Sequence, residues 1–76
     1  MKVTLESTSK IVSFNGIECR IWEGITAKGV ACHAYISRIS VKEGQPESLY
    51  AQFEHELKET RKPSPEVEAI PLRMIL

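Results

Sequence analysis

Aspartate is missing from this sequence of 76 residues, in which all ten acidic residues are glutamate. The sequence therefore excludes calcium-binding loops built on spaced aspartates and catalytic triads oriented by an aspartate. Long apolar runs are missing too, since stretches such as 30–32 and 74–76 are far shorter than the roughly 18 to 20 residues of a membrane-spanning helix. The sequence predicts a protein that does not cross a membrane.

Cysteine is scarce, with two in the whole sequence. Residues 1–6 lack the apolar core of a signal peptide. Two cysteines in a chain without such a signal are most simply interpreted as reduced thiols, because disulfides persist mainly in oxidising compartments. We therefore expect the protein to be cytoplasmic.

A chain of this length encloses only one small hydrophobic core, so we expect a single domain over residues 1–76. Its 42% apolar and 26% charged residues are typical of a folded globular domain. The net charge is zero, but residues 1–42 carry +3 and residues 43–68 carry −4. Nonspecific attachment to nucleic acid needs a field of one sign, so nucleic acid is not the expected partner.

Asn15-Gly16 is the strongest local signal in the sequence, because this pair suits a two-residue hairpin turn with both central residues at positive φ. It predicts a β-hairpin in which Phe14 pairs with Ile17. The same register sets four further pairs: Val12 with Cys19, Ile11 with Arg20, Lys10 with Ile21, and Ser9 with Trp22.

A second turn is predicted at residues 26–29, where a loop ending in Gly29 allows two registers. A four-residue loop pairs Ile25 with Val30, whereas a three-residue loop pairs Thr26 with Val30. Pattern consistency favours the four-residue loop, because the three-residue loop would place Tyr35 and His33 on the face that should be buried. With the four-residue loop, Trp22 lies opposite His33, Arg20 opposite Tyr35, Glu23 opposite Cys32 and Ile21 opposite Ala34.

The second half of the sequence predicts a helix and a closing strand. Proline is tolerated in a first helical turn, so the helix begins near Pro46, and the prolines of 62–65 end it. Its apolar residues form one stripe: Leu49, Tyr50, Phe53 and Leu57. The strand over 70–76 places alternate apolar residues on one face, and Pro71 puts it at an edge of the sheet or delays its pairing. These alternate residues are Ile70, Leu72, Met74 and Leu76.

Together these elements predict an α+β fold: a twisted antiparallel sheet of four to five strands with one helix packed on one face, in the order ββββαβ. Val3 and Leu5 belong to a short first strand of their own. The helix stripe is expected to cover the apolar face of the sheet. The residues assigned to that face are Val12, Phe14, Ile17, Cys19, Ile21, Ala34 and Ile36.

Motifs for catalysis and metal binding are incomplete. His55-Glu56-x-x-Glu59 has glutamate where a zinc-binding helix needs its second histidine. The preferred register points His33 away from both cysteines, and a fold of this size seldom encloses a substrate pocket. We predict a protein that is not an enzyme and that holds no metal and no cofactor.

The remaining candidate is a surface on the outer face of the sheet. The predicted register gathers five residues there: Ile11, Arg20, Trp22, His33 and Tyr35. Tryptophan, tyrosine and arginine dominate the hot spots of protein interfaces, so we predict a protein-binding or self-associating module that uses the Trp22/Tyr35 face. Small cores gain stability from association, which makes a homodimer one expected form. The competing interpretation is that Trp22 only packs over its cross-strand neighbours or under the C-terminal segment.

Two other functions are consistent with the sequence. In the first, the same face binds single-stranded nucleic acid weakly, with Trp22 and Tyr35 stacking on bases. The phosphates are then contacted by Arg20, Lys10 and Arg38. In the second, the glutamates of the helix contact a basic partner, although a solvated helix face is the commoner reason for such charge.

Three segments resemble small uncharacterised proteins encoded by phages and prophages: NGIECRIWEG at 15–24, AYISRI at 34–39 and IPLRMIL at 70–76. The resemblance covers most of the chain. It implies an accessory role during infection or lysogeny, exerted by binding a host or phage protein, and it transfers no site residues.

Overall fold

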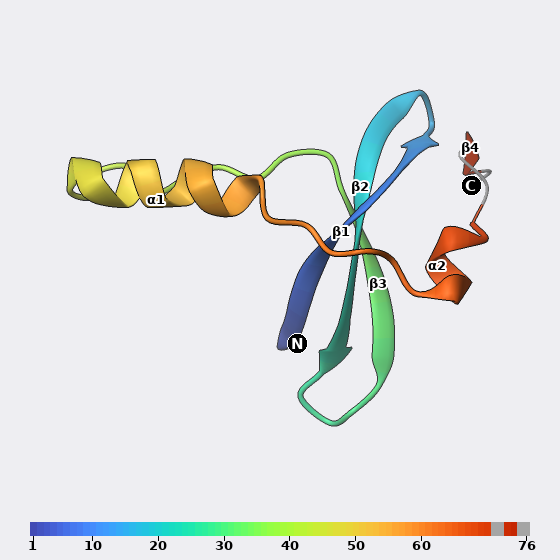
Figure 1. Ribbon diagram of the computed structural model, residues 1–76. Helices are drawn as coiled ribbons and strands as arrows, with labels where there is room; N and C mark the ends of the chain where they lie inside the picture. Colours follow the sequence, from blue (N-terminus) through green and yellow to red (C-terminus); the bar gives the residue numbers. More distant parts are fainter. Residues whose placement is uncertain (71–72, 75–76) are drawn as a thin grey trace.

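The computed structural model describes residues 1–70 and 73–74 of the chain. Three long β-strands come first, followed by two helices and a two-residue strand (Figure 1). Their bounds are β1 Val3–Phe14, β2 Ile17–Thr26, β3 Ala31–Ile36, α1 Glu47–Leu57, α2 Pro65–Glu68 and β4 Arg73–Met74. The sheet order is β3-β2-β1-β4, with β1, β2 and β3 antiparallel and β4 parallel to β1. Within these described residues, no helix is long and apolar enough to cross a membrane.

The first hairpin forms as predicted at its turn. Asn15 and Gly16 both have positive φ, at 51° and 80°, as the two-residue turn requires. Phe14 pairs with Ile17, and the register continues through Val12 with Cys19 and Ile11 with Arg20. These three predicted pairs are confirmed.

Beyond Ile11 the predicted register is wrong. Trp22 pairs with Ser7 instead of Ser9, so residues 8–10 together face Ile21, and Lys10 is not its partner. The displaced segment is held from both sides. The buried Thr8 hydroxyl donates to the Ile21 carbonyl at 2.7 Å, and the Ser9 amide donates to the Arg61 carbonyl at 3.0 Å. A bulge forms here because the Ser9 amide bonds to Arg61, 52 positions along the chain, and residues near Ser9 in the sequence do not indicate that partner.

The second hairpin adopts the register that the hydrophobic pattern disfavoured. Trp22 pairs with Ala34, Ile21 with Tyr35, Glu23 with His33 and Arg20 with Ile36. Hydrogen bonds of the turn explain the outcome. The Thr26 amide donates to the Val30 carbonyl at 2.9 Å, and the Thr26 hydroxyl accepts from the Val30 amide at 3.0 Å. The three-residue loop is therefore closed on both sides of Thr26, and this local bonding outweighs the loss of clean alternation.

The core lies on the Ile21 side of the sheet and is covered by α2. Val12, Ile21 and Val67 form its fully buried cluster, with Ile70 packed against it. The predicted cover by Leu49, Phe53 and Leu57 is wrong, because no residue of α1 is buried. Figure 1 shows α1 extending away from the strands while α2 lies on the other side of them.

Helix α2 falls in a segment that was expected only to end the preceding helix. Ser64 caps it by accepting from the Val67 amide, and Pro65 occupies the first turn, where its missing N–H costs nothing. Helix α1 already ends at Leu57, before Pro63, and Pro65 begins a new helix. Four residues suffice because Val67 is fully buried on the sheet.

The α+β class is confirmed, whereas the order ββββαβ is not. The predicted first strand at Val3 and Leu5 is the beginning of the continuous β1, and α2 is an additional helix. The closing strand is described only at Arg73–Met74, which pair with Ser13 and Phe14. Its predicted residues Leu72 and Leu76 lie outside the described residues.

Candidate protein-binding groove

The five residues predicted to form one binding surface lie on two faces of the sheet. Residues directly paired across antiparallel strands share a face, and neighbours along a strand alternate. Ile11, Arg20 and Trp22 therefore lie on one face, and His33 and Tyr35 lie on the other. The one-residue shift in the second hairpin causes this separation, because it reverses the face of every residue in β3 relative to the prediction.

Tyr35 packs locally on the core side of the sheet. Its ring stacks on Phe14 of β1, with ring centroids 6.1 Å apart and planes at 20°. His33 lies opposite Glu23 on the same face. This pairing of aromatic rings stabilises the sheet, and it removes Tyr35 from the surface that contains Trp22.

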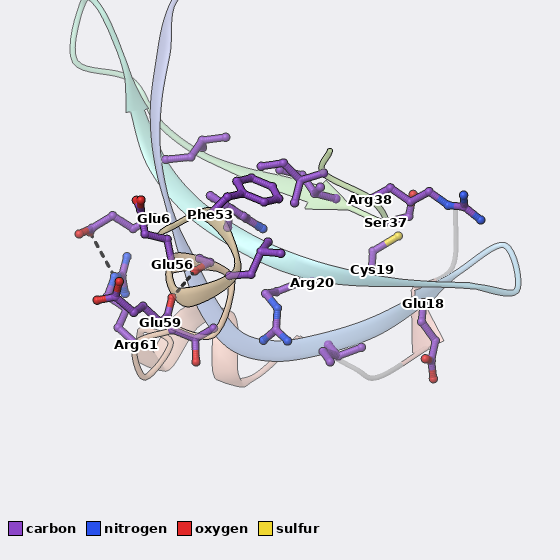
Figure 2. A pocket seen from close by; sticks show the side chains of 18 residues that line it. Glu6, Glu18, Cys19, Arg20, Ser37, Arg38, Phe53, Glu56, Glu59 and Arg61 are labelled. Carbon is purple, nitrogen blue, oxygen red and sulfur yellow. Dashed lines mark hydrogen bonds and ion pairs between the residues drawn. The ribbon is translucent and has the colours of Figure 1, made fainter. Parts of the chain in front are cut away.

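On the other face, Trp22 lines an open groove between the sheet and the C-terminal half of α1. Figure 2 shows this groove, with Arg20 of β2 and Phe53 and Glu56 of α1 among its labelled lining. We call this the Trp22 groove, and its volume is about 710 Å³. Its apolar lining comes from both sides: Leu5, Ile11, Trp22, Ile36 and Ile39 from the strands and the segment after β3, and Phe53 and Leu57 from α1. Its polar lining is Glu6, Ser7, Glu18, Cys19, Arg20, Ser37, Arg38, Glu56, Glu59, Thr60 and Arg61.

One hydrogen bond ties the C-terminal side of α1 to the sheet: the Ser7 hydroxyl donates to the Glu59 carbonyl at 2.9 Å, just after the helix. Before α1, the Tyr50 hydroxyl accepts from the amides of Gly44 and Gln45 at 3.0 and 3.3 Å, which closes the preceding loop onto the helix. The N-terminal end of α1 is thus bonded to its own loop and not to the sheet.

Charges around the groove are nearly balanced, with three arginines against four glutamates. Arg20 is occupied, because its Nη1 donates to the Thr8 carbonyl at 2.8 Å. Arg61 is occupied as well, by Glu6 and Glu23. Arg38 is exposed in the segment after β3. The groove therefore offers an apolar floor with a mixed polar rim.

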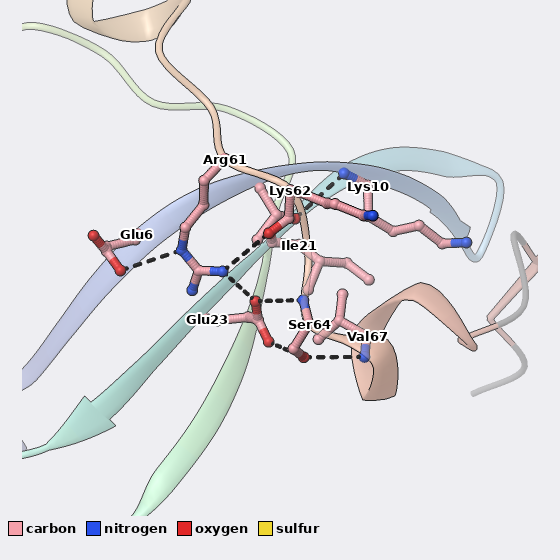
Figure 3. A network of polar contacts seen from close by, with 9 residues as sticks. Glu6, Lys10, Ile21, Glu23, Arg61, Lys62, Ser64 and Val67 are labelled. Atoms are coloured by element: carbon pink, nitrogen blue, oxygen red, sulfur yellow. Dashed lines mark hydrogen bonds and ion pairs between the residues drawn. The ribbon is translucent and has the colours of Figure 1, made fainter.

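A polar network behind the groove fastens α2 to the sheet (Figure 3). The Glu23 carboxylate accepts from the Ser64 hydroxyl, from the Ser64 amide at 3.1 Å and from Arg61 Nη1 at 2.7 Å. The Ser64 hydroxyl, followed by the Ser64 amide and Arg61, lowers the pKa of Glu23 below its ordinary value of 4.5, against a raising effect of desolvation. The hydrogen bond to Glu23 raises the pKa of Arg61 in turn.

This network predicts a pH-dependent stability. Since the pKa of Glu23 is lower in the folded protein than in the unfolded chain, its carboxylate stabilises the fold above about pH 4.5, and that contribution is lost as the pH falls through the folded value. Glu23→Gln is expected to lower the free energy of unfolding by about 1–2 kcal/mol at neutral pH, with a difference that shrinks in acid. Urea unfolding at neutral and acidic pH measures it.

Glu6→Gln is the matched control, because Glu6 contacts the same arginine with a side chain that is 72% exposed. An exposed ion pair of this kind contributes little. Equal losses in both variants, or a Glu23→Gln loss that persists unchanged in acid, would contradict the assigned role of Glu23.

The cysteines and histidines do not converge in the part of the chain that the structure describes. Cys19 and Cys32 are free thiols, and Cys19 is buried at the edge of the groove. His55 lies on α1, with its Nε2 4.0 Å from Glu59. Among residues 1–70 and 73–74, no three potential metal ligands form a group.

Sequence reasoning identified only part of the groove. The helix stripe and Trp22 were both recognised, but they were assigned to opposite sides of the sheet. Ile39 was not among the predicted binding residues; it lies in the irregular segment after β3 and lines the groove from there. Comparison of the chain with protein-family models, with curated proteins and with solved structures finds no match.

Proposed function

We propose that this chain is a non-catalytic protein-interaction module that binds its partner in the Trp22 groove. The observation that supports this most directly is the groove itself, in which apolar side chains from the sheet and from α1 face an open space. Ile11, Ile39 and Leu57 are each more than 40% exposed there. Clustered exposed apolar side chains with a polar rim are typical of protein-binding surfaces.

The total surface of the molecule supports the same proposal. The chain exposes 6168 Å², whereas a compact monomer of 8.6 kDa exposes about 4,700 Å². Its radius of gyration is 13.9 Å, against about 11 Å for a compact chain of this length. The excess area of about 1,500 Å² is larger than the roughly 800 Å² that a standard interface removes from each partner.

The residue types in the groove fit a protein partner better than nucleic acid. Trp22 is the only tryptophan of the chain and lies beside Arg20, and both types are enriched in interface hot spots. Single-stranded nucleic acid would need free cations beside the aromatic ring. Two of the three arginines are already bonded to the protein, and four glutamates line the same groove.

The resemblance to phage-encoded proteins suggests the biological setting in which such a module would act. A small accessory protein that acts during infection or lysogeny would work by occupying a surface of a host or phage protein. The groove supplies such a contact without any catalytic step.

Site-specific photo-crosslinking tests the proposed function. Ile39→benzoylphenylalanine places the probe in the groove, at a side chain that is 48% exposed. Val30→benzoylphenylalanine is the control, because Val30 is exposed at the turn between β2 and β3 and does not line the groove. We expect a discrete crosslinked protein from the Ile39 position, in purified protein or in extract of the cells that encode the chain, and none from Val30.

The second part of the crosslinking experiment removes the tryptophan side chain. Trp22→Ala is expected to weaken that crosslink by roughly 30-fold or more, and Tyr35→Ala, on the other face, is expected to leave it unchanged. If Ile39 crosslinks no protein in either sample, or if Tyr35→Ala has the larger effect, the groove is not the binding surface.

A further inference from the structure

Helix α1 is an amphipathic helix without a sufficient partner in its own chain. Its apolar stripe consists of Leu49, Tyr50, Phe53 and Leu57, and no residue of the helix is buried. A helix of 11 residues is marginal in water unless its apolar side packs against something. Leu49, at the N-terminal end of the stripe, is 46% exposed and lies outside the Trp22 groove. The stripe therefore requires a further contact.

We propose that the occupant of the Trp22 groove is a second copy of this chain, whose α1 stripe packs against the groove while the first copy's stripe packs reciprocally. The inference rests on the proposed function, because it uses the same groove. A twofold interface needs a surface that is complementary to itself. One chain here carries both parts: the groove, lined by Phe53 and Leu57 on its α1 side, and the exposed Leu49 at the other end of the same stripe.

Charge does not select the occupant, because three arginines and four glutamates line the groove together. The complementary parts are apolar: the exposed stripe of α1 and the apolar lining of the groove.

The available area is sufficient for a stable pair. A standard interface removes about 800 Å² from each partner, and the chain has about 1,500 Å² more surface than a compact monomer of its mass. The segments that flank α1, at 37–46 and 58–64, are largely irregular. They allow α1 to pack against a second copy of the chain. Figure 1 shows the resulting projection of α1 away from the strands.

Sedimentation equilibrium of the purified full-length protein, across a concentration series, tests the inference. We expect a mass twice the 8.6 kDa of one chain. Leu49→Glu is expected to weaken the dimer by roughly 100-fold, because it places a charge in the paired stripe. Ala51→Glu is the matched control, with the same new residue on the opposite side of α1, and is expected to leave the mass unchanged. Circular dichroism of each variant establishes that the sheet persists.

Isotope-filtered NMR on a mixture of ¹³C-labelled and unlabelled chains supplies the contact map. Intermolecular signals between Leu49 and the groove residues Ile36 or Ile39 are expected. A monomer at every concentration, a dimer that Leu49→Glu leaves intact, or intermolecular signals confined to the edge of β3 would each overturn the inference. If the chain is monomeric but Ile39 still crosslinks another protein, only the second-copy inference fails; if Ile39 crosslinks nothing, the proposed function fails with it.

Discussion

Ile21→Ala is expected to lower the free energy of unfolding by about 2–5 kcal/mol, a large part of the roughly 4–11 kcal/mol available to a domain of this size. Ile21 is completely buried and contacts Val12 and Val67, the other fully buried apolar residues of the core cluster. Alanine leaves a cavity that the sheet cannot close, because α2 is held above it by the Glu23–Ser64 bonds. The measurement is urea unfolding at a fixed protein concentration, since association would shift the apparent stability.

Ile25→Ala provides the comparison for this core substitution. Ile25 lies on the same strand and the same face, but its side chain is 48% exposed. The same change of side chain there is expected to cost less than about 1 kcal/mol, because little apolar area leaves the interior. Similar losses at Ile21 and Ile25 would show that the core is not where the structure places it.

Gly24→Ala is expected to detach the first half of β1 from β2 and to destabilise the protein by about 2–3 kcal/mol. Gly24 lies opposite Leu5, and a Cβ at this position would overlap the Thr4 carbonyl oxygen and come within 2.7 Å of Leu5 Cδ2. Backbone cannot yield as a flexible side chain would, so the pairing of residues 3–7 must open. Amide hydrogen exchange is expected to accelerate over that segment while the pairs near the Asn15-Gly16 turn stay protected.

Gly44→Ala separates this steric effect from ordinary glycine strain. Gly44 has a φ of 87°, and no atom lies within 4 Å of a Cβ built there. Alanine is expected to cost about 1–2 kcal/mol through its backbone conformation alone, with faster exchange confined to the loop before α1. Unchanged protection of β1 in Gly24→Ala would contradict the close approach of the two strands.

The two turns show where local chemistry was sufficient and where it was not. Asn15-Gly16 defines its hairpin because both residues tolerate positive φ, and the adjacent pairs follow. At residues 26–29 the hydrophobic pattern and the turn favoured different registers. The bonds of Thr26 prevailed, and Glu23 was tolerated on the core face because Arg61 and Ser64 satisfy its carboxylate. Neither partner can be inferred from residues near Glu23 in the sequence.

The groove was predictable in its parts and unpredictable in its assembly. Trp22 and the α1 stripe stand out in the sequence because aromatic content and helical spacing are local properties. Their meeting depends on α2, since Val67 occupies the core face and leaves α1 without a place there. His33 and Tyr35 lie outside the candidate site for a local reason: the bonds between Thr26 and Val30 shift the second hairpin by one residue.

By itself, the sequence determined the α+β class, the position of both hairpin turns, the amphipathic helix and the absence of complete catalytic motifs, because each of these depends on neighbours a few residues apart. Tertiary structure alone decided which helix covers the core, how β1 bulges at Thr8 and which face holds Trp22. Those outcomes depend on hydrogen bonds and burial between residues that are tens of positions apart, such as Ser9 with Arg61 and Ile21 with Val67. The residues next to each of these in the sequence do not indicate such distant partners.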